Sequence, residues 1–262
     1  MNLDLSGKTA IVCGSTQGIG KATALQLAKM GANIVLVARN EVKLASVQEE
    51  LDISKGQRHN FVKADFNFPT ELKLSVEEII KKNGPAHILV NNTGGPPGGA
   101  AIGAKTDEYT SAFKMHLISN QCLAQAVVVG MKSEGYGRII NVISTSVKQP
   151  LNGLGVSNTI RGAVASWSKT LANELGEFNI TVNNVLQGAT NTIRLQSIIE
   201  NKASKTGRSI EDISNEMTNQ VPMRRFAEAV EIANAISFLA SPAASYINGI
   251  NVPVDGGRTK SL

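Results

Sequence analysis

The sequence predicts an α/β fold of the Rossmann type, with a doubly wound parallel sheet and helices on both faces in three αβα layers. Short apolar runs alternate with longer helical patterns along all 262 residues, which is typical of repeated βαβ units. The runs are apolar at successive positions, as in strands that are covered on both faces. A glycine-rich stretch, VCGSTQGIG, joins the first run to the first helical pattern, and such a turn is typical of this fold.

Apolar runs and helical patterns define the expected elements. Strands are predicted at residues 9–14, 33–38, 60–65, 87–92, 138–144, 180–186 and 250–255. Helices are predicted near residues 18–30, 41–54, 70–83, 107–134, 155–177 and 228–240. No linker or repeat interrupts this alternation, so we expect one domain over residues 1–262.

Residues 191–226 break the rhythm with a long, polar helical excursion. Its apolar residues recur at helical spacing in both halves, which predicts two amphipathic helices. We expect them either to form a lid over an apolar cleft or to pack against a neighbouring subunit.

Composition narrows the function classes. Apolar residues make up 42% of the chain and charged residues 18%, which excludes a disordered or fibrous protein. The net charge is +5, but Lys and Arg are scattered and aromatic residues make up only 4%, so we predict no nucleic-acid surface. The two cysteines lack metal-ligand spacing, the N-terminus does not read as a signal peptide, and no apolar window reaches membrane-spanning length. We therefore expect a soluble, cytoplasmic protein without a metal or membrane contact.

The glycine-rich stretch predicts a phosphate-binding turn. Its glycines allow a tight turn and a close approach of the backbone to a pyrophosphate, and the following helix offers free N–H groups. The expected turn comprises Gly14, Ser15, Thr16, Gln17, Gly18, Ile19 and Gly20. The alternative is an ordinary glycine-rich connection from strand to helix.

The end of the second predicted strand indicates which dinucleotide binds. An NAD site usually carries Asp or Glu there, for the ribose 2′-hydroxyl, whereas this chain has Ala38 and then Arg39. A guanidinium binds a 2′-phosphate that a carboxylate would repel. We therefore predict NADP(H), with Arg39 on the 2′-phosphate and hydrogen bonds from Ser15, Thr16 and Asn40. Alternatively, Arg39 is a surface loop residue.

Several motifs together resemble the short-chain dehydrogenase/reductase family, and especially its 3-oxoacyl-ACP reductases. They are CGSTQGIG, Asp65 after the third strand, NNTG at 91–94, GRIINVIS at 137–144, ITVNNVLQG at 180–188, VPMRRF at 221–226 and VPVDGG at 252–257. The resemblance implies a single dinucleotide-binding domain, a nicotinamide cofactor, a small-molecule substrate and a homo-oligomer. That oligomer would be a dimer or tetramer, built on the helices near 107–134 and 155–177.

The same resemblance assigns further cofactor contacts. It implies that Asp65 faces the adenine, that Asn91 and Gly94 support the ribose, and that Gly188 and Thr192 lie by the nicotinamide carboxamide. Asp65 can instead cap the end of its strand. Gln187 stands where the family usually has proline, so the loop on the nicotinamide side is expected to differ in shape.

The family's catalytic Asn, Ser, Tyr and Lys are largely replaced. Ser144 matches the serine, but Ser157 stands at the tyrosine position, Arg161 at the lysine position and His116 at the asparagine position. A serine hydroxyl is a far weaker acid than a tuned tyrosine, and an arginine does not give up its proton. Arg161 can still hold the cofactor ribose through its forked donors.

These replacements leave two readings of function open. In the first, the chain is an NADP(H)-dependent oxidoreductase in which Ser144 polarises the substrate oxygen. His116, with a reference pKa of about 6.5, then supplies a proton through water and Ser157. Its substrate is a fairly apolar ketone or alcohol, or a 3-oxoacyl thioester as the family resemblance suggests. Alternatively, His116 is a hydrogen-bonded residue of a packed helix. In the second, the chain is a cofactor-binding pseudoenzyme, either a redox sensor or a non-catalytic oligomer partner.

Overall fold

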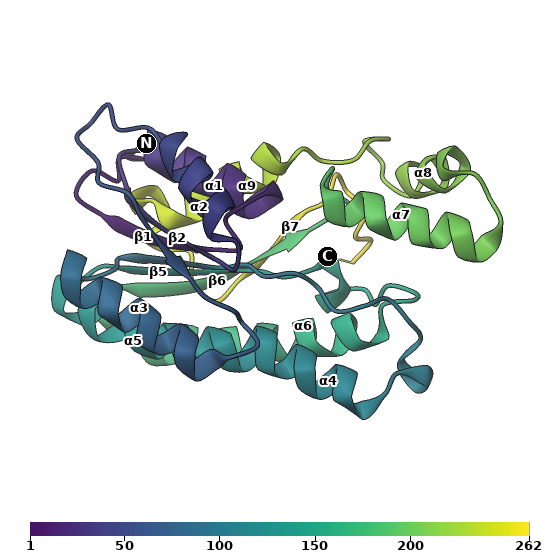
Figure 1. Cartoon of the computed structure of the whole chain (residues 1–262), viewed down its shortest axis with the longest axis horizontal. Helices are drawn as coiled ribbons and strands as arrows, with labels where there is room; N and C mark the ends of the chain where they lie inside the picture. Colours follow the sequence, from purple (N-terminus) through teal and green to yellow (C-terminus); the bar gives the residue numbers. More distant parts are fainter. Residues whose placement is uncertain (262) are drawn as a thin grey trace.

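A seven-stranded parallel sheet forms the centre of the computed structural model, which describes residues 1–261 (Figure 1). The strand order is β3-β2-β1-β4-β5-β6-β7, and every neighbouring pair is parallel. The strands are β1 (Thr9–Cys13), β2 (Asn33–Ala38), β3 (Asn60–Lys63), β4 (Ile88–Asn91), β5 (Gly137–Val142), β6 (Ile180–Gln187) and β7 (Asn251–Val254). Because the order reverses between β1 and β4, a crevice opens at the carboxyl ends of these strands. The predicted α/β Rossmann-type fold is confirmed.

Helices cover both faces of the sheet (Figure 1). One face carries α1 (Gly18–Lys29), α2 (Glu41–Glu49) and α9 (Ala229–Ala240), and the other carries α3 (Pro69–Asn83), α5 (Ser119–Glu134) and α6 (Gly155–Leu175). The helix expected over 107–134 is interrupted: α4 (Thr106–Phe113) passes into a π-helical turn, Lys114–Ile118, before α5 begins. Within residues 1–261, no helix has the length and apolarity needed to span a bilayer.

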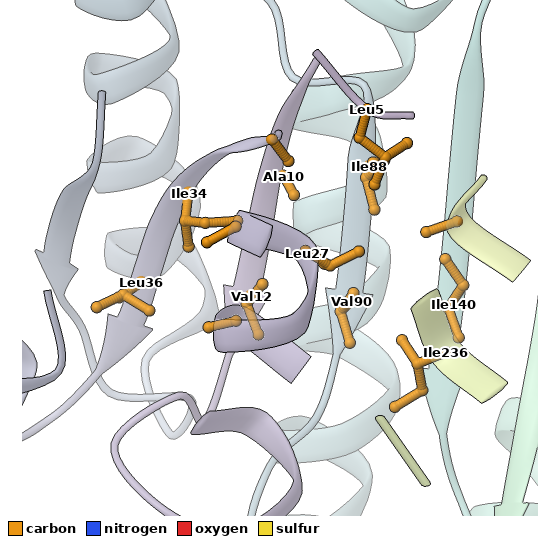
Figure 2. Packing of buried hydrophobic residues seen from close by; sticks show 14 of the residues in the cluster. Leu5, Ala10, Val12, Leu27, Ile34, Leu36, Ile88, Val90, Ile140 and Ile236 are labelled. Carbon is orange, nitrogen blue, oxygen red and sulfur yellow. The ribbon is translucent and has the colours of Figure 1, made fainter. Parts of the chain in front are cut away.

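Alternation of side chains explains why the strand runs are apolar throughout. On β1, Ala10 and Val12 pack toward α1 and α9, whereas Ile11 and Cys13 pack toward α3, α5 and α6. Figure 2 shows the first of these cores, where Leu27 of α1 and Ile236 of α9 lie over β1, β4 and β5. Each fully buried Leu, Ile or Val contributes roughly 1.5–3 kcal/mol relative to an exposed one, so both faces stabilise the sheet.

A row of asparagines crosses four strands in register. Asn91 pairs with Asn141, Asn141 with Asn184, and Asn184 with Asn251 in the parallel ladder. Each side-chain amide donates to the next side-chain oxygen, over 2.8, 3.0 and 2.8 Å, and Asn141 also donates to Ser168 Oγ of α6. The row satisfies polar groups that would otherwise be costly inside the sheet.

Residues 191–226, called the lid segment below after the first of their two expected roles, contain two helices, α7 (Ile193–Thr206) and α8 (Ile210–Asn219). They project beyond the sheet together (Figure 1). Leu195, Ile199, Ala203 and Ile213 form a separate apolar cluster with Met217 and Phe226 packed against it. The predicted pair of amphipathic helices is therefore present, and most of its apolar side chains face each other. Ile193 remains exposed at 61% and is one of the residues that line the neighbouring cavity.

Candidate active site

One cavity of about 900 Å³ opens where the carboxyl ends of the strands meet α6 and α7. Most of the predicted site residues line it: Gly14, Thr16, Gln17, Gly18, Ile19, Arg39, Asn40, Asp65, Gly94, Ser144, Ser157, Arg161 and Thr192. The structure therefore brings the glycine turn and three of the family's four catalytic positions to one place, whereas His116, at the fourth, is not among the residues that line the cavity.

The glycine turn has the shape of a phosphate cradle. Gly14 and Gly18 have φ angles of +60° and +54°, which favour glycine. A Cβ on Gly14 would lie 2.6 Å from the carbonyl oxygen of Asn92, and one on Gly20 would lie 2.2 Å from that of Gly14. Helix α1 begins at Gly18 without a side-chain cap, so its first N–H groups are available to an anion. The turn thus fits the diphosphate of a dinucleotide.

Ser15 and Gly20 support this turn from outside the cavity. Ser15 is buried, and its Oγ accepts a hydrogen bond from the Val37 N–H over 3.0 Å. This hydrogen bond connects the turn to β2. Ser15 is not among the residues that line the cavity, so the predicted contact between its hydroxyl and a 2′-phosphate is not supported. Gly20 allows α1 to pack closely on the turn.

Asn92, rather than Asn91, links β4 to the cavity. The Asn92 amide donates to the carbonyls of Cys13 and Gly14 over 3.2 and 3.5 Å, and the residue lines the cavity together with Thr93. Asn91, for which a ribose contact was predicted, points its side chain into the asparagine row. The NNTG motif marked this strand end, but strand alternation assigns the two asparagines to different surroundings.

Basic side chains gather at the end of β2. Arg39 has a side chain that is 73% exposed and lies 3.9 Å from Asp65, too far for a tight pair. Asn40 caps α2 by accepting from the Lys43 N–H, and Lys43 also lines the cavity. Lys43 was missed from the sequence, although it lies four residues after Arg39 and on the first turn of α2. Together they form a cationic corner.

Asp65 and the nicotinamide-side residues have mixed placements. Asp65 lines the cavity and also accepts from the N–H and side chain of Asn67, so the strand-end cap that was its alternative role is present. Thr192 caps α7 and packs against the glycine turn, because a Cβ on Gly18 would lie 3.2 Å from its methyl group. Gly188 is not among the residues that line the cavity, and a Cβ on it would lie 2.7 Å from the Cα atom of Asp255.

Ser144, Ser157 and Arg161 share the inner wall of the cavity. Ser144 follows β5, and its Oγ accepts from the Ser146 N–H over 3.1 Å, so its own proton remains free to be donated. Ser157 and Arg161 lie one helical turn apart on α6. Arg161 donates to the Val142 carbonyl over 3.1 Å. Burial, and then the charge of Arg194, lowers the pKa of Arg161 to about 10, so the guanidinium stays protonated at neutral pH.

His116 lies in the π-helical turn and is only 1% exposed. Burial, and then the charge of Arg161, lowers the pKa of His116 to about 2, while a backbone hydrogen bond with Gly94 acts in the opposite direction. The expectation that this side chain titrates near 6.5 is therefore wrong, because a buried imidazole beside an arginine disfavours a second positive charge. His116 is neutral in the working range, and its Nε2 atom has no hydrogen-bond partner within residues 1–261.

Arg194 closes the outer side of the cavity. It lies in the first turn of α7 and donates to the Pro96 carbonyl over 2.8 Å, which connects the lid segment to the loop after β4. The sequence did not indicate this residue, because the contact joins positions 98 apart. Apolar side chains complete the wall at Met115, Leu154, Ile193 and Ile198. Among residues 1–261, no group of three His, Cys, Asp or Glu side chains could hold a metal ion.

Comparisons with known proteins place this geometry in a family. Residues 14–259 match the family described as enoyl-(acyl carrier protein) reductase. The chain is 30% identical to the NADPH-dependent reductase BacG of Bacillus subtilis, over 98% of this chain and 100% of that protein. It is 32% identical to the 3-oxoacyl-[acyl-carrier-protein] reductase FabG of Staphylococcus epidermidis, over 95% and 98% of the two chains.

A solved structure extends the likeness to three dimensions. The L-sorbose reductase of Gluconobacter frateurii, solved with NADPH and L-sorbose, superposes with a TM-score of 0.93 at 33% identity and covers both chains fully. The family match, the relatives and the fold agree with the motifs found in the sequence. The chain belongs to the short-chain dehydrogenase/reductase family.

Proposed function

We propose that this chain is an NADP(H)-dependent oxidoreductase that transfers hydride between the cofactor and a carbonyl or hydroxyl carbon of a small molecule. The observation that carries the proposal is the single cavity joining the glycine turn, the Arg39 corner and the Ser144 wall. The relatives support it, since BacG is described as NADPH-dependent and the L-sorbose reductase structure contains NADPH.

The chain's own residues fit this cofactor. The turn from Gly14 to Gly20 would hold the diphosphate, Arg39 and Lys43 would hold the 2′-phosphate, and Asp65 would face the adenine. Gly94, Thr192 and Arg161 would hold the nicotinamide ribose and carboxamide. When bound, NADPH supplies the hydride for carbonyl reduction.

In this proposal, Ser144 and Arg161 provide most of the electrostatic stabilisation of the reacting substrate oxygen. The Ser146 N–H orients Ser144 Oγ, so the hydroxyl proton points to the substrate oxygen and stabilises the negative charge that develops there. The positive charge of Arg161 also stabilises the negative charge that develops on the substrate oxygen, because Arg161 is buried.

Proton delivery runs through neutral groups. Ser157, which lines the cavity, hands its proton to the substrate oxygen and recovers one from water. His116 is not among the lining residues, so its unpaired Nε2 would join this relay only through a further, buried water. Because His116 is neutral, solvent is the final proton source. The substrate is a ketone with an apolar body or a 3-oxoacyl-like compound, in keeping with the apolar part of the cavity wall at Met115, Leu154 and Ile198.

The test begins with calorimetric titration of NADPH and NADH, followed by a screen of ketones for NADPH oxidation. Tight NADPH binding, weak NADH binding and turnover that Ser144→Ala abolishes would support the proposal. Failure of NADPH to bind would overturn it.

The second candidate is a cofactor-binding pseudoenzyme that acts as a redox sensor or as a non-catalytic oligomer partner. The observation in its favour is that Ser157 replaces the family's tyrosine and that His116 does not titrate near neutral pH. Tight NADPH binding without turnover of any ketone in the screen would favour this candidate. Either candidate can assemble as a homodimer or homotetramer through α5 and α6, and sedimentation of the purified protein tests that assembly.

A further inference from the structure

Two arginines face the substrate side of the cavity without an acidic partner. Arg161 and Arg194 both line it, and neither forms an ion pair with a carboxylate in residues 1–261. The charged side chain that most affects Arg161 is Arg194 itself. Arg161 is buried, whereas Arg194 is exposed to solvent. The buried charge of Arg161 therefore has a like charge as its neighbour, and an anion held by Arg194 would stabilise it.

A comparison with Arg138 shows what is unusual about this pair. Arg138 is also buried without a carboxylate, but it lies over the Tyr136 ring at 4.2 Å and donates to the carbonyls of Gly137 and Asn179. Arg138 is not among the residues that line the cavity. Arg161 has one carbonyl partner, that of Val142, and opens into the cavity. The remaining donors of Arg161 are therefore available to a ligand.

Arg194 is positioned rather than loose. One of its terminal nitrogens is held by the Pro96 carbonyl, and the guanidinium lies beside Gly95, where a Cβ would approach it to 3.8 Å. A guanidinium has five N–H donors in a planar fork, so the remaining ones can bind a carboxylate at two points. The contact directs Arg194 to the loop after β4, which borders the same space as Ser144 and Ser157.

The cofactor phosphates have other partners. The diphosphate fits the glycine turn and the start of α1, and the 2′-phosphate fits the corner of Arg39 and Lys43 at the opposite end of the cavity. The one acidic side chain among the described cavity residues, Asp65, lies at that distant end, 3.9 Å from Arg39. The substrate side is therefore positively charged and not screened by an acid.

We propose that the substrate is an oxo-carboxylate, whose ketone oxygen faces Ser144 and Ser157 while Arg194, assisted by the charge of Arg161, binds its carboxylate. This inference rests on the proposed function and adds the chemical class of the substrate. The apolar residues Met115, Leu154 and Ile198 then receive the rest of the molecule. Binding the anion also joins the lid segment to α6, because it bridges one arginine from each.

The test compares acids with their neutral esters. The probes are 2-oxo-4-phenylbutanoate and 4-oxo-4-phenylbutanoate, each beside its methyl ester, reduced with NADPH by the wild type, Arg194→Gln and Arg194→Lys. Lys205→Gln, an exposed cation at the other end of α7, is the control that removes the same net charge. Calorimetry measures NADPH binding by each variant.

We expect the wild type to prefer at least one acid over its ester by roughly 10–100-fold in kcat/KM, the effect of one charge-assisted pair. Arg194→Gln should reduce that preference at least about tenfold, mainly through KM. Ester reduction should fall far less than acid reduction, because the ester has no carboxylate for Arg194 to bind. NADPH affinity should stay within about twofold of the wild type. Arg194→Lys should retain part of the preference and Lys205→Gln all of it.

No preference in the wild type, or the same preference in Arg194→Gln, overturns the proposal. So does weaker NADPH binding by Arg194→Gln with an unchanged preference, because that would place the residue on the cofactor.

Binding without turnover separates this inference from the proposed function. The acids are also titrated into the protein saturated with NADP⁺, or into the protein alone if NADP⁺ does not bind. Acid binding that Arg194→Gln abolishes, with no reduction of any probe, keeps the anion site and overturns the reductase. Absence of binding of both acids to the wild type overturns the anion site, whatever the reductase activity toward the esters.

Discussion

The guanidinium of Arg161 donates to the carbonyl oxygen of Val142 over 3.1 Å, which fixes the middle of the cavity wall to the last residue of β5. A lysine at this position has three donors on one nitrogen and cannot bind the carbonyl and the cavity with the same spread. The replacement of lysine by arginine thus changes the geometry as well as the residue type.

Arg161 variants should separate charge from geometry. We expect Arg161→Lys to lower kcat/KM about tenfold, because charge is kept but the forked contact is lost. Arg161→Met should lower it by roughly 10²–10³-fold, since the buried charge is removed. Steady-state kinetics with NADPH measure both. Full activity of Arg161→Met would show that the charge plays no part in the reaction.

Arg39 and Lys43 should determine the choice of cofactor. We expect Arg39→Ala or Lys43→Ala to weaken NADPH binding by roughly 10–100-fold, because each removes a charged contact with the 2′-phosphate. NADH binding should change by less than about twofold, since NADH lacks that phosphate. Calorimetry gives both affinities. Equal losses for the two cofactors would contradict the assignment.

Ser144 and Ser146 form a matched pair for testing the oxygen-polarising role. Ser144→Ala should lower kcat by roughly 10²–10³-fold, the usual effect of losing one donor to a developing oxyanion. Ser146 follows in the same turn, and its Oγ is buried without a partner in the described residues. Ser146→Ala keeps the N–H that orients Ser144 and should retain activity. Similar losses in both variants would point to a general disturbance of the turn.

Lowering the pH should reduce the free energy of unfolding, because two buried histidines resist protonation in the folded state. Burial, and then the charge of Lys8, lowers the pKa of His87, although Glu134 opposes the shift, and His116 is lowered to about 2. In the unfolded chain both imidazoles take up protons below about pH 6.5. The folded state does so only at lower pH, so stability is flat above pH 6.5 and falls as pH drops from there toward the lowered pKa values.

His116→Asn tests this pH dependence. The variant lacks one titrating group, so its free energy of unfolding should fall less steeply than that of the wild type between pH 6 and pH 4, by roughly 1 kcal/mol per pH unit. Urea unfolding at several pH values measures it. An unchanged slope would mean that the folded and unfolded states protonate His116 alike.

The asparagine row should respond most strongly at its centre. Asn141→Ala removes side-chain bonds to Asn91, Asn184 and Ser168 and leaves buried groups unpaired, so we expect a loss of about 2–4 kcal/mol. Asn251→Ala lies at the end of the row and removes one bond within it, so we expect about 1 kcal/mol. Chemical denaturation of the two variants gives the comparison. Equal losses would contradict cooperation along the row.

The fold was readable from the sequence because periodicity and burial are local signals. Both faces of β1 are apolar, so TAIVC predicted a strand covered on both sides, and the glycine turn followed from its position after that strand. The π-helical turn at His116 was not predicted, because the change of phase from one extra residue is small against the loose apolar spacing over 107–134. For the same reason, the environment that lowers the pKa of His116 could not be foreseen.

The candidate site was readable only where motifs fix the register. Ser144, Ser157 and Arg161 were found by their spacing, and the cavity brings them together. Arg194 was missed because its partners, the Pro96 carbonyl and the charge of Arg161, are distant in sequence. Ser15 and Asn91 belong to the motifs, but their side chains bond within the protein. A motif therefore locates a site and does not say which of its atoms face the ligand.

The separate apolar cluster of α7 and α8 has a consequence for the relation between local opening of these helices and the thermal stability of the main core. Leu195, Ile199 and Ile213 are buried against their own neighbours in the lid segment, and the clusters around β1 are separate from them. We therefore expect local opening of α7 and α8 to cost less free energy than unfolding of the sheet. Substitutions on these helices that alter the substrate should then leave the melting temperature of the main core largely unchanged.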